Sequence, residues 1–321
     1  MNAGRNSESS LNQETARGSA SPQTLEIRTA LKEAISRLRA AGVPSDTLAA
    51  EVLLMHTLGR DRTWIYTHAE DLVESSVADR FFSLVGRRAA GEPTQYLTGK
   101  QEFWGLEFEV TPAVLIPRPE TEHVIEVALE RLGPRGIKIR MDTGAPSPKL
   151  RVADVGTGSG CIAVALAYEL PHADLFATDI SEAALEIARH NALRHGVAER
   201  IDFLHADLLQ PLLRGQQSFD LIVSNPPYIS RREAPSLQRE VVDHEPGIAL
   251  FGGPRGIEIY ERLIEEARIL LRSGGFLVLE LGHDSAKPVR AMLEKQFCWT
   301  KLSVTNDLAG IPRVIAAERA E

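Results

Sequence analysis

The feature that most constrains this chain is a regular alternation of short apolar runs with helical patterns across its second half. Strands that are separated by helices form a parallel sheet covered by helices on both faces. The last two strands have no helix between them, so we expect an antiparallel hairpin at one edge of this α/β sheet. The predicted strands are 151–155, 174–178, 201–205, 219–224, 275–281, 298–305 and 312–318, and the predicted helices are 161–169, 182–194, 256–272 and 285–295.

The first part of the chain shows a different pattern, which predicts a separate small domain. Its apolar residues recur at helical spacing and are interrupted by Gly-Pro stops, as in a helical bundle. The first residues of the chain contain almost no large apolar side chain, which is typical of disorder. The predicted organisation is a disordered leader at 1–24, a helical domain at 25–95, a hinge and hairpin at 96–110, and an α/β domain at 111–321 with a loop at 133–149.

The net charge of −8 argues against a protein that binds long nucleic acid. Residues 25–100 carry ten basic and ten acidic side chains, so the negative excess lies further along the chain. Proteins that bind duplexes usually carry a basic surface, and we therefore expect no bulk nucleic-acid binding. No apolar run approaches the ~20 residues that a membrane-spanning helix needs, so we expect no membrane partner.

The two cysteines, Cys161 and Cys298, do not suggest a disulfide framework. Such scarcity is typical of a protein from a reducing cytoplasm, which is where we expect this chain to act. The nine histidines show no metal-ligand spacing and do not cluster with the cysteines, so we predict no metal site. Cys161 follows a glycine-rich segment and is expected to be a small buried residue at the start of a helix.

A glycine-rich turn connects the strand at 151–155 with the helix at 161–169. Glycines allow a tight turn and let a ligand lie directly against the backbone. The same glycines can also serve only the packing of the turn, so this loop is an open candidate when taken alone. The candidate cofactor-binding residues are Gly156, Thr157, Gly158, Ser159 and Gly160.

Polar residues at the ends of the next two strands support a nucleotide-like ligand. Asp179 stands about 20 residues after the glycine loop, where an acidic residue can bind ribose hydroxyls. Its alternative role is to cap the helix at 182–194, which Ser181 can do equally well. Asp207 can accept a hydrogen bond from an adenine amino group, and Leu208 can pack on the ring. The glycine spacing differs from the G-x-G-x-x-G pattern of dinucleotide-binding proteins.

The strand at 219–224 ends in the most specific motif of the chain, Asn225-Pro226-Pro227-Tyr228. Two prolines lack N–H groups and fix φ near −65°, which stiffens the loop and leaves its carbonyls free to accept hydrogen bonds. The Asn225 side-chain oxygen and a neighbouring carbonyl can receive both hydrogens of an –NH₂ group, while Tyr228 offers a flat face to a planar acceptor. The alternative is an ordinary proline-stiffened turn.

This loop suits the methylation of an amide-like nitrogen, whose lone pair is delocalised and therefore poorly nucleophilic. Two acceptors can polarise the N–H bonds and orient the nitrogen toward a sulfonium methyl group, so positioning and electrostatic stabilisation reduce the barrier. We predict an S-adenosylmethionine-dependent methyltransferase with Asn225, Pro226 and Tyr228 as catalytic residues. Asn225, Pro226, Pro227 and Tyr228 form the predicted substrate site, and Asn225 is also expected to contact the cofactor.

Together these motifs resemble the PrmC/HemK family, the glutamine methyltransferases of bacterial peptide chain release factors. The likeness covers about residues 25–319 and includes 103–108, 115–122 and 307–314. The tetrapeptide Asn225–Tyr228 also occurs in adenine-N6 methyltransferases. The run Ile116-Pro117-Arg118-Pro119-Glu120-Thr121-Glu122 is much more restricted to this family, and it is intact.

The resemblance implies a small N-terminal helical domain joined to a Rossmann-like class I methyltransferase domain. It implies that Gly156–Gly160, Asp179 and Leu208 contact S-adenosylmethionine. It also implies that Asn225–Tyr228 hold the glutamine of the release factor's Gly-Gly-Gln motif for methylation at N5. None of these positions departs from the family pattern. Release factors are the implied partners, and we expect a monomer.

Three questions stay open at this point. The helical domain can dock the protein substrate or serve only as a lid. Within the run at 116–122, Pro119 and Glu120 can be structural, with Pro119 at a first helical position, whereas Arg118 can lie near the site. Asn225–Tyr228 can also act on an exocyclic amine of an extruded base, although the net charge argues against this. A non-catalytic cofactor-binding module is disfavoured because the acceptor loop is intact.

Overall fold

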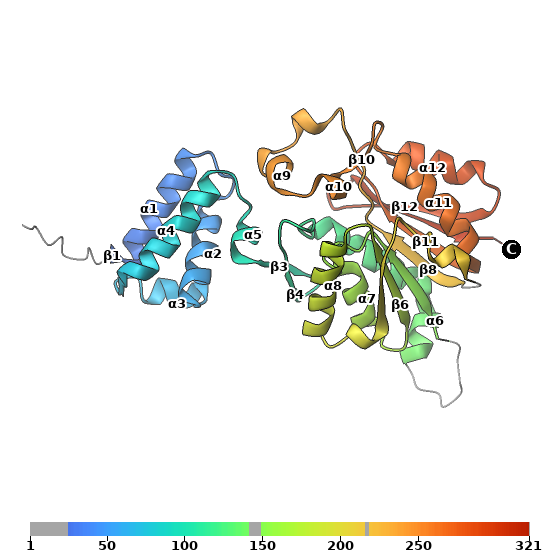
Figure 1. Ribbon diagram of the computed structural model, residues 1–321, viewed down its shortest axis with the longest axis horizontal. Coiled ribbons are helices and arrows are strands. Elements are labelled where there is room, and N and C mark those ends of the chain that lie inside the picture. The colour runs from blue at the N-terminus through green and yellow to red at the C-terminus, as the bar shows by residue number, and fades with distance from the viewer. Residues whose placement is uncertain (1–24, 141–148, 216–217, 321) are drawn as a thin grey trace, which may run out of the picture. The chain divides into compact units, whose positions relative to one another are not determined.

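The computed structural model describes residues 25–140, 149–215 and 218–320. The chain divides into two compact units, Met1–Gly86 and Arg87–Glu321, which are coloured from blue to red along the chain in Figure 1. The leader predicted at 1–24 lies outside the described residues. Within the described residues, none of the helices is both long enough and apolar enough to cross a membrane.

The first unit is helical, as predicted from its apolar spacing. In α1 the residues Ile27, Leu31, Ala34 and Leu38 recur on one face, and all four are buried. The start of α3 is capped by Asp61, whose side chain accepts a hydrogen bond from the Trp64 N–H at 2.7 Å. Its elements are β1 (Leu25–Glu26), α1 (Ile27–Ala40), α2 (Asp46–Leu58), α3 (Arg62–Thr67), β2 (Leu72–Val73) and α4 (Ser75–Ala89), with β1 and β2 paired antiparallel.

A short helix and a hairpin precede the sheet of the second unit. They are α5 (Thr94–Thr98), β3 (Lys100–Phe103) and β4 (Leu106–Glu109), and the two strands pair antiparallel. The two strands of the hairpin are joined by a turn at Trp104 and Gly105. Phe103 and Phe108 are buried and meet edge to face, with ring centroids 6.1 Å apart. This contact anchors the hairpin in the core of the second unit.

The predicted sheet is confirmed, with a seven-stranded order of β12-β13-β11-β8-β5-β6-β7. The five neighbouring strands β11, β8, β5, β6 and β7 run parallel to one another. β13 pairs antiparallel with both β11 and β12. The strand order reverses between β5 and β8, and ligands bind at such a switch point in open α/β sheets. The strands are β5 (Arg151–Val155), β6 (Asp174–Asp179), β7 (Ile201–His205), β8 (Phe219–Ser224), β11 (Leu271–Glu280), β12 (Trp299–Asn306) and β13 (Pro312–Arg319).

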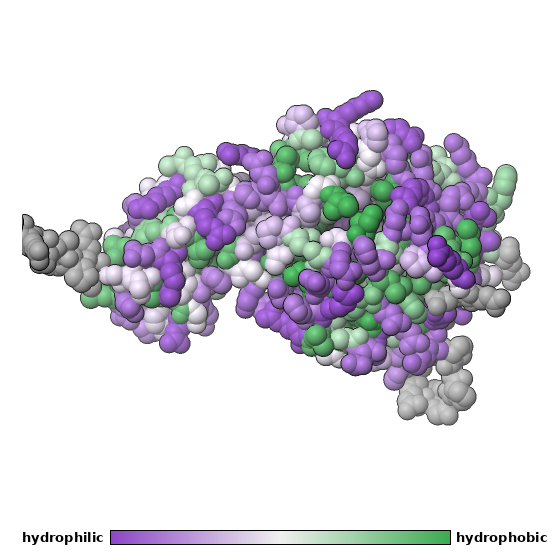
Figure 2. All heavy atoms as spheres, in the orientation of Figure 1, coloured by the Kyte–Doolittle hydropathy of each residue, from purple (hydrophilic) through white to green (hydrophobic). Residues whose placement is uncertain are grey.

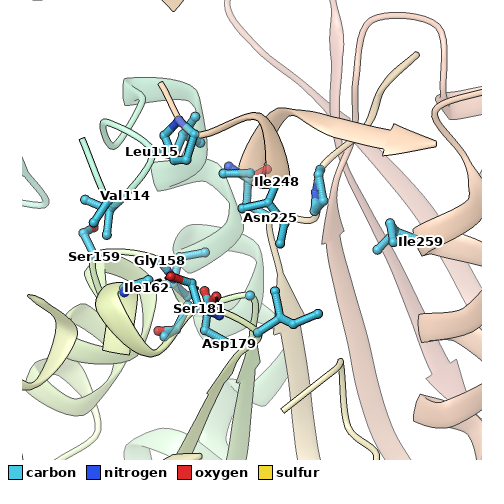
Figure 3. A pocket seen from close by; sticks show the side chains of 18 of the residues that line it. Val114, Leu115, Gly158, Ser159, Ile162, Asp179, Ser181, Asn225, Ile248 and Ile259 are labelled. Atoms are coloured by element: carbon cyan, nitrogen blue, oxygen red, sulfur yellow. Dashed lines mark hydrogen bonds between the residues drawn. The ribbon is translucent and has the colours of Figure 1, made fainter. Parts of the chain in front are cut away.

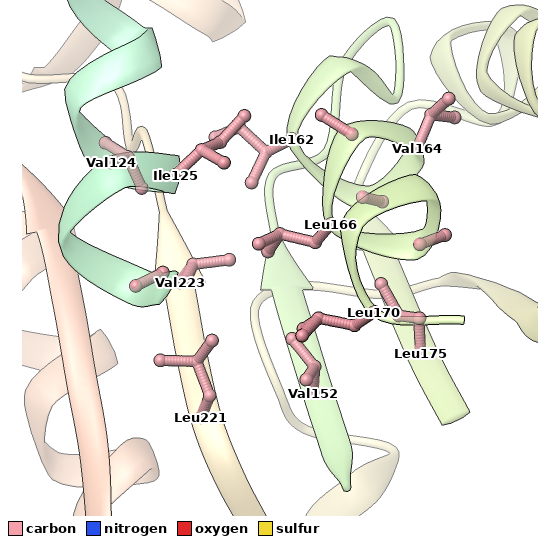
Figure 4. Packing of buried hydrophobic residues seen from close by; sticks show 14 of the residues in the cluster. Val124, Ile125, Val152, Ile162, Val164, Leu166, Leu170, Leu175, Leu221 and Val223 are labelled. Atoms are coloured by element: carbon pink, nitrogen blue, oxygen red, sulfur yellow. The ribbon is translucent and has the colours of Figure 1, made fainter. Parts of the chain in front are cut away.

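Helices cover both faces of this sheet. One face packs against α6, α7 and α8, and the other packs against α11 and α12. Figure 4 shows Val124 and Ile125 of α6 facing Ile162 of α7 over the central strands. Polar residues dominate the visible outer surface in Figure 2, as expected when the apolar faces are turned inward. The helices are α6 (Glu122–Arg140), α7 (Cys161–Glu169), α8 (Glu182–Arg194), α11 (Glu258–Leu270) and α12 (Ala286–Lys295).

One segment differs from the prediction, and a second segment had no predicted structure. The prediction of a loop from Gly133 is wrong over its first part, because α6 continues to Arg140. The helix is kinked at Gly133, where φ is 48° and ψ is −137°. The rest of that loop, 141–148, lies outside the described residues. The connection from β8 to α11 folds into β9 (Ile229–Ser230), α9 (Arg239–His244), α10 (Gly247–Leu250) and β10 (Phe251–Gly253), with β9 and β10 parallel. Short 3-10 turns lie at Pro119–Thr121, Ala198–Arg200, Leu212–Arg214 and Ala234–Ser236.

Candidate functional site

The glycine loop follows β5 at the switch point of the sheet, and its glycines have two separate functions. Gly156 and Gly158 have φ values of 71° and 55°, and a Cβ added to either residue would meet nothing within 4 Å. Gly160 also has a positive φ, of 81°, but its Cβ would lie only 3.0 Å from the Cβ of Ala188. Gly160 therefore serves the packing of α7 against α8, whereas Gly156 and Gly158 leave open backbone for a ligand.

A buried carboxyl group and a buried amide hold this loop in place. Asp154 accepts hydrogen bonds from the Thr157 hydroxyl at 2.7 Å and from the Ala163 N–H at 3.1 Å. Burial raises the pKa of Asp154 to about 7. The Asn191 side chain donates to the Ser159 carbonyl at 2.9 Å and also bonds both backbone groups of Glu109. The hairpin and the glycine loop are therefore fixed to each other through α8.

Asp179 ends β6 beside the glycine loop, and its carboxylate is turned toward that loop. Its two oxygens accept hydrogen bonds from the Gly158 N–H and the Ser181 N–H, each at 2.9 Å. The helix cap itself is Ser181, whose side chain accepts from the Ala184 N–H at 3.2 Å. Burial raises the pKa of Asp179, whereas these backbone donors lower it. Each oxygen retains acceptor capacity, so the group can bind two neighbouring hydroxyls.

The end of β7 adds a third side to the site. Leu208 has a φ of 53°, which is unusual for a residue other than glycine and costs roughly 1–2 kcal/mol. The Asp207 carboxylate forms an ion pair with Arg262 of α11 at 2.7 Å. This pairing occupies one oxygen of Asp207 and brings a guanidinium group to the site that the sequence motifs did not reveal.

A cavity of about 250 Å³ lies above these strand ends, which is far more room than a water molecule or a metal ion needs. Figure 3 shows some of the side chains that line it. Most predicted cofactor residues line it, namely Gly156, Thr157, Gly158, Ser159, Asp179, Asp207, Leu208 and Asn225, and so does Pro227. Gly160, Pro226 and Tyr228 are not among the lining residues.

An apolar wall of this cavity was not among the predicted site residues. It is built by 113–117 before α6 and by 246–251 around α10, including Val114, Leu115, Ile248 and Phe251. The Tyr96 hydroxyl donates to the Val114 carbonyl at 2.6 Å and so fixes the first of these segments. Val114, Ile248 and Phe251 stand outside the motifs, because only the fold brings them to the mouth of the sheet.

The acceptor loop, Asn225–Tyr228, follows β8. Since β8 pairs with β5, this loop begins next to the glycine loop at the same edge of the sheet. Ser224 ties the two strands together by donating its hydroxyl to the Val155 carbonyl at 2.6 Å. The Asn225 side-chain nitrogen donates to the Thr121 hydroxyl at 3.1 Å, which turns its side-chain oxygen away from Thr121. Burial, and then the negative charge of Glu280, raise the pKa of the Tyr228 hydroxyl well above its ordinary value.

Three glycines from distant segments form a socket around the acceptor loop, and the motifs did not identify them. A Cβ at Gly252 would collide with the Pro227 carbonyl oxygen, and one at Gly256 would collide with the Tyr228 carbonyl oxygen. A Cβ at Gly282 would lie 2.6 Å from Cδ2 of the Tyr228 ring. The backbone of the loop and its aromatic ring are thus held by direct contact with glycine.

Arg118 lies beside the site but is occupied by an ion pair. Its guanidinium group contacts the buried carboxylate of Glu245, which also accepts a hydrogen bond from the Ile116 N–H at 3.3 Å. Pro119 stands at the start of the 3-10 turn Pro119–Thr121, which agrees with its structural interpretation. The pair therefore ties the segment before α6 to the segment after α9.

The donor and acceptor set of this cavity fits S-adenosylmethionine. Asp179 can bind the two ribose hydroxyls, and Leu208 can pack against the adenine ring. The open backbone over Gly156 and Gly158 leaves space for the amino-acid end of the ligand. Within the described residues, no group of three or more His, Cys, Asp or Glu side chains is placed to hold a metal ion. The fold and this site define a methyltransferase.

Two family models match the chain, the PrmC N-terminal domain at residues 29–99 and the methyltransferase small domain at residues 139–246. The release factor glutamine methyltransferase of Koribacter versatilis (strain Ellin345) is 44% identical over 293 residues, which are 91% of this chain and 98% of that protein. The protein of the same name from Moorella thermoacetica is 44% identical over 295 residues, with 92% and 99% covered. The chain belongs to the release factor glutamine methyltransferase family, which confirms the resemblance, and S-adenosylmethionine is its methyl donor.

Solved structures share the fold at lower sequence identity. The delta-N METTL16 MTase domain has a TM-score of 0.50 and 21% identity, and covers 68% of this chain and 90% of that chain. The hMettl16 catalytic domain in complex with MAT2A 3'UTR hairpin 6 has a TM-score of 0.52 and 16% identity, with 78% and 86% covered. These similarities support the class I methyltransferase fold of the second unit.

Proposed function

We propose that this chain transfers the methyl group of S-adenosylmethionine to N5 of the glutamine in the Gly-Gly-Gln motif of peptide chain release factors. The observation that carries the proposal is the orientation of Asn225 at the end of β8. Its side-chain nitrogen is bonded to Thr121, so its oxygen is available to the cavity that Asn225 lines. The family to which the chain belongs supports the substrate class.

The cofactor half of the site binds and orients the methyl donor. Asp179 holds the ribose, while Leu208 and Asp207 contact the adenine. Residues Gly156–Gly160 form the turn that carries the amino-acid end, with Gly160 acting through packing. When bound, S-adenosylmethionine supplies an electrophilic methyl group on a positively charged sulfur. The apolar wall around Val114 and Ile248 excludes water from that group.

The acceptor half of the site binds the glutamine amide through two acceptors. Asn225 Oδ1 is the first. The second is the Pro226 carbonyl, for which the described residues supply no hydrogen-bond donor. The Pro227 carbonyl is less suitable because it packs against Gly252. With both N–H bonds directed at these oxygens, the plane of the amide would be fixed, and Tyr228 would support that plane from one side.

The amide proton passes to solvent after the methyl group has been transferred, and S-adenosylhomocysteine is the other product. The residues therefore need only stabilise the growing acidity of the nitrogen. Asn225 Oδ1 and the Pro226 carbonyl provide that stabilisation because they are fixed before the reaction begins. A single copy of the chain is the proposed active form. The helical unit serves to dock the release factor, and the cytoplasm is the proposed place of action.

The test is a competition between acceptors. Purified chain is incubated with methyl-labelled S-adenosylmethionine, a release factor, and an excess of RNA and DNA. A matched release factor, in which the Gly-Gly-Gln glutamine is replaced by alanine, serves as the control. The proposal predicts label in the first release factor only. Label in the nucleic acid, or equal label in both release factors, would contradict it.

A further inference from the structure

Two side chains of α11 hold the short segment that follows β7, and the mechanism above gives neither of them a role. The Arg262 guanidinium donates a hydrogen bond to Oδ2 of Asp207 at 2.7 Å. One turn later on the same helix, the Glu266 carboxylate accepts a hydrogen bond from the Leu209 N–H at 2.8 Å. These contacts lie on either side of Leu208, whose φ of 53° is positive. One helix therefore fixes this segment on both sides of its unusual residue.

This segment lies at one end of the cavity, away from the glycine loop. In the sheet, β6 separates β7 from β5, the strand that the glycine loop follows. Figure 3 shows Ile259 of α11 across the cavity from Ser159 of the glycine loop. Arg262, Asp207 and Leu208 line the same cavity. With the amino-acid end of S-adenosylmethionine over the glycines, the adenine ring lies at the end built by Leu208 and α11.

The ion pair leaves one oxygen of Asp207 free for a ligand. Oδ2 is bonded to Arg262, whereas Oδ1 has no hydrogen-bond partner among the residues that the structure describes. A carboxylate oxygen accepts hydrogen bonds, and the 6-amino group of adenine donates them. Because Arg262 fixes the carboxylate at Oδ2, the direction of Oδ1 is set before the ligand arrives.

The contact between Arg262 and Asp207 contributes little to the stability of the fold. The two side chains are 42% and 41% exposed, and ion pairs with such exposure are weak because water screens them. The same helix carries a comparable pair, Arg268 with Glu265 at 3.1 Å, whose members do not line the cavity. The Arg262 pair differs from this one in bordering the ligand, which indicates a role in binding.

We propose that Arg262 is a positioning residue for the cofactor, which holds the Asp207 carboxylate so that Oδ1 accepts a hydrogen bond from the 6-amino group of adenine. Glu266 supports this arrangement by fixing the backbone beyond Leu208. Through Asp207 the site distinguishes adenine from a purine that lacks the amino group. The inference deepens the proposed function and rests on its adenine contact at Asp207, but it does not depend on the identity of the methyl acceptor.

The first test measures the binding of two ligands that differ only in this amino group. They are S-adenosylhomocysteine and its analogue in which hydrogen replaces the 6-amino group, and calorimetry gives both Kd values. We expect the wild type to bind the analogue about tenfold more weakly, because Asp207 Oδ1 then has no donor. Equal affinity of the wild type for both ligands would overturn the proposal.

Two substitutions of Arg262 test whether its charge holds Asp207. Arg262→Met keeps an apolar stem but removes the guanidinium group, whereas Arg262→Lys keeps a cation that can pair with Asp207. The preference for the ligand with the amino group should fall to about twofold in Arg262→Met and return to within about twofold of the wild-type value in Arg262→Lys. An unchanged preference in Arg262→Met, or the same loss in both variants, would overturn the proposal.

Arg268→Met is the matched control, because it removes a similarly exposed arginine of the same helix whose side chain does not line the cavity. Both Kd values should remain at the wild-type level in this variant. The ratio of the two Kd values also separates positioning from folding, since a general distortion of the site weakens both ligands equally. If Arg268→Met reduced the preference as much as Arg262→Met, the effect would not be specific to Asp207 and the proposal would fail.

A double variant tests whether Arg262 acts through Asp207. Asp207→Ala should abolish the preference by itself, and the addition of Arg262→Met should change the ratio of Kd values no further. A preference that survives in Asp207→Ala, or a further change in the double variant, would overturn the proposal. Because these measurements need no methyl acceptor, they remain decisive even if the wild type fails to methylate a release factor, which would refute only the proposed substrate.

Discussion

The contact between Gly282 and the Tyr228 ring provides the sharpest test of how the acceptor loop is held. Gly282→Ala adds a Cβ 2.6 Å from Cδ2 and 3.0 Å from Cγ of that ring. Ordinary contact begins at 3.4 Å, so the ring must retreat by about 0.8 Å. Gly282 is not in the left-handed region, so the effect comes from this contact and not from backbone strain. Overpacking of this kind costs about 1–3 kcal/mol of stability.

The expected result is a selective loss of turnover. A displacement of about 1 Å next to a reacting group can reduce the rate on the order of 100-fold, so kcat in Gly282→Ala should fall by about 10- to 100-fold. The affinity for S-adenosylmethionine, measured by calorimetry, should stay near the wild-type value because Gly282 is not among the lining residues. Steady-state methylation of a release factor measures kcat.

A matched control is available in the helical unit. A Cβ at Gly86 would meet nothing within 4 Å, so Gly86→Ala should leave kcat unchanged and change the free energy of unfolding by at most about 1 kcal/mol. Wild-type kcat in Gly282→Ala would refute the argument that the glycine socket positions the ring. An equal loss of kcat and cofactor affinity would also refute it, because the damage would then extend beyond the acceptor loop.

Three further predictions concern the two halves of the site and the buried acid. Asn225→Ala should lower kcat on the order of 100-fold with nearly unchanged cofactor affinity by calorimetry, and equal loss of both would contradict its role. Asp179→Ala should instead weaken S-adenosylmethionine binding by about 10- to 100-fold, and unchanged affinity would contradict the ribose assignment. The pKa of Glu280 is raised from 4.5 to about 7 in the folded chain. Below pH 4.5 the group is protonated in both the folded and the unfolded chain. Between pH 4.5 and about 7 only the unfolded chain loses the proton, so the free energy of unfolding falls as the pH rises. Relative to Glu280→Gln, the free energy of unfolding of the wild type should therefore fall by up to about 3 kcal/mol over that range, whereas parallel pH profiles from denaturant unfolding would contradict the shift.

The sheet was predictable because its strands are buried on both faces and stand out as short apolar runs. β5 and β8 have the predicted bounds, 151–155 and 219–224. The start of β11 was less visible, since Gly274 and Gly275 interrupt its apolar pattern and the pairing with β8 is irregular there. The continuation of α6 beyond Gly133 was missed because a glycine followed by a proline usually marks the end of a helix.

The site residues that could be predicted lie together in short segments of the sequence. Gly156 and Gly158 belong to one turn, and Asn225 belongs to one stiff loop. The supporting residues were not predictable in this way, because Thr121, Glu280 and the socket glycines are distant in sequence and meet the acceptor loop only in the folded chain. The sequence also left open whether Asp179 or Ser181 caps α8, and the structure assigns the cap to Ser181.

The central claim is that the methyl group is transferred to an amide nitrogen of glutamine, and acid hydrolysis tests it most directly. A release factor is methylated with labelled S-adenosylmethionine, its Gly-Gly-Gln peptide is isolated, and the peptide is hydrolysed. Hydrolysis of an N-methyl amide releases methylamine, so the account predicts labelled methylamine from this peptide. Label that remains in the amino-acid fraction, or that is released as methanol from an ester, would contradict the account.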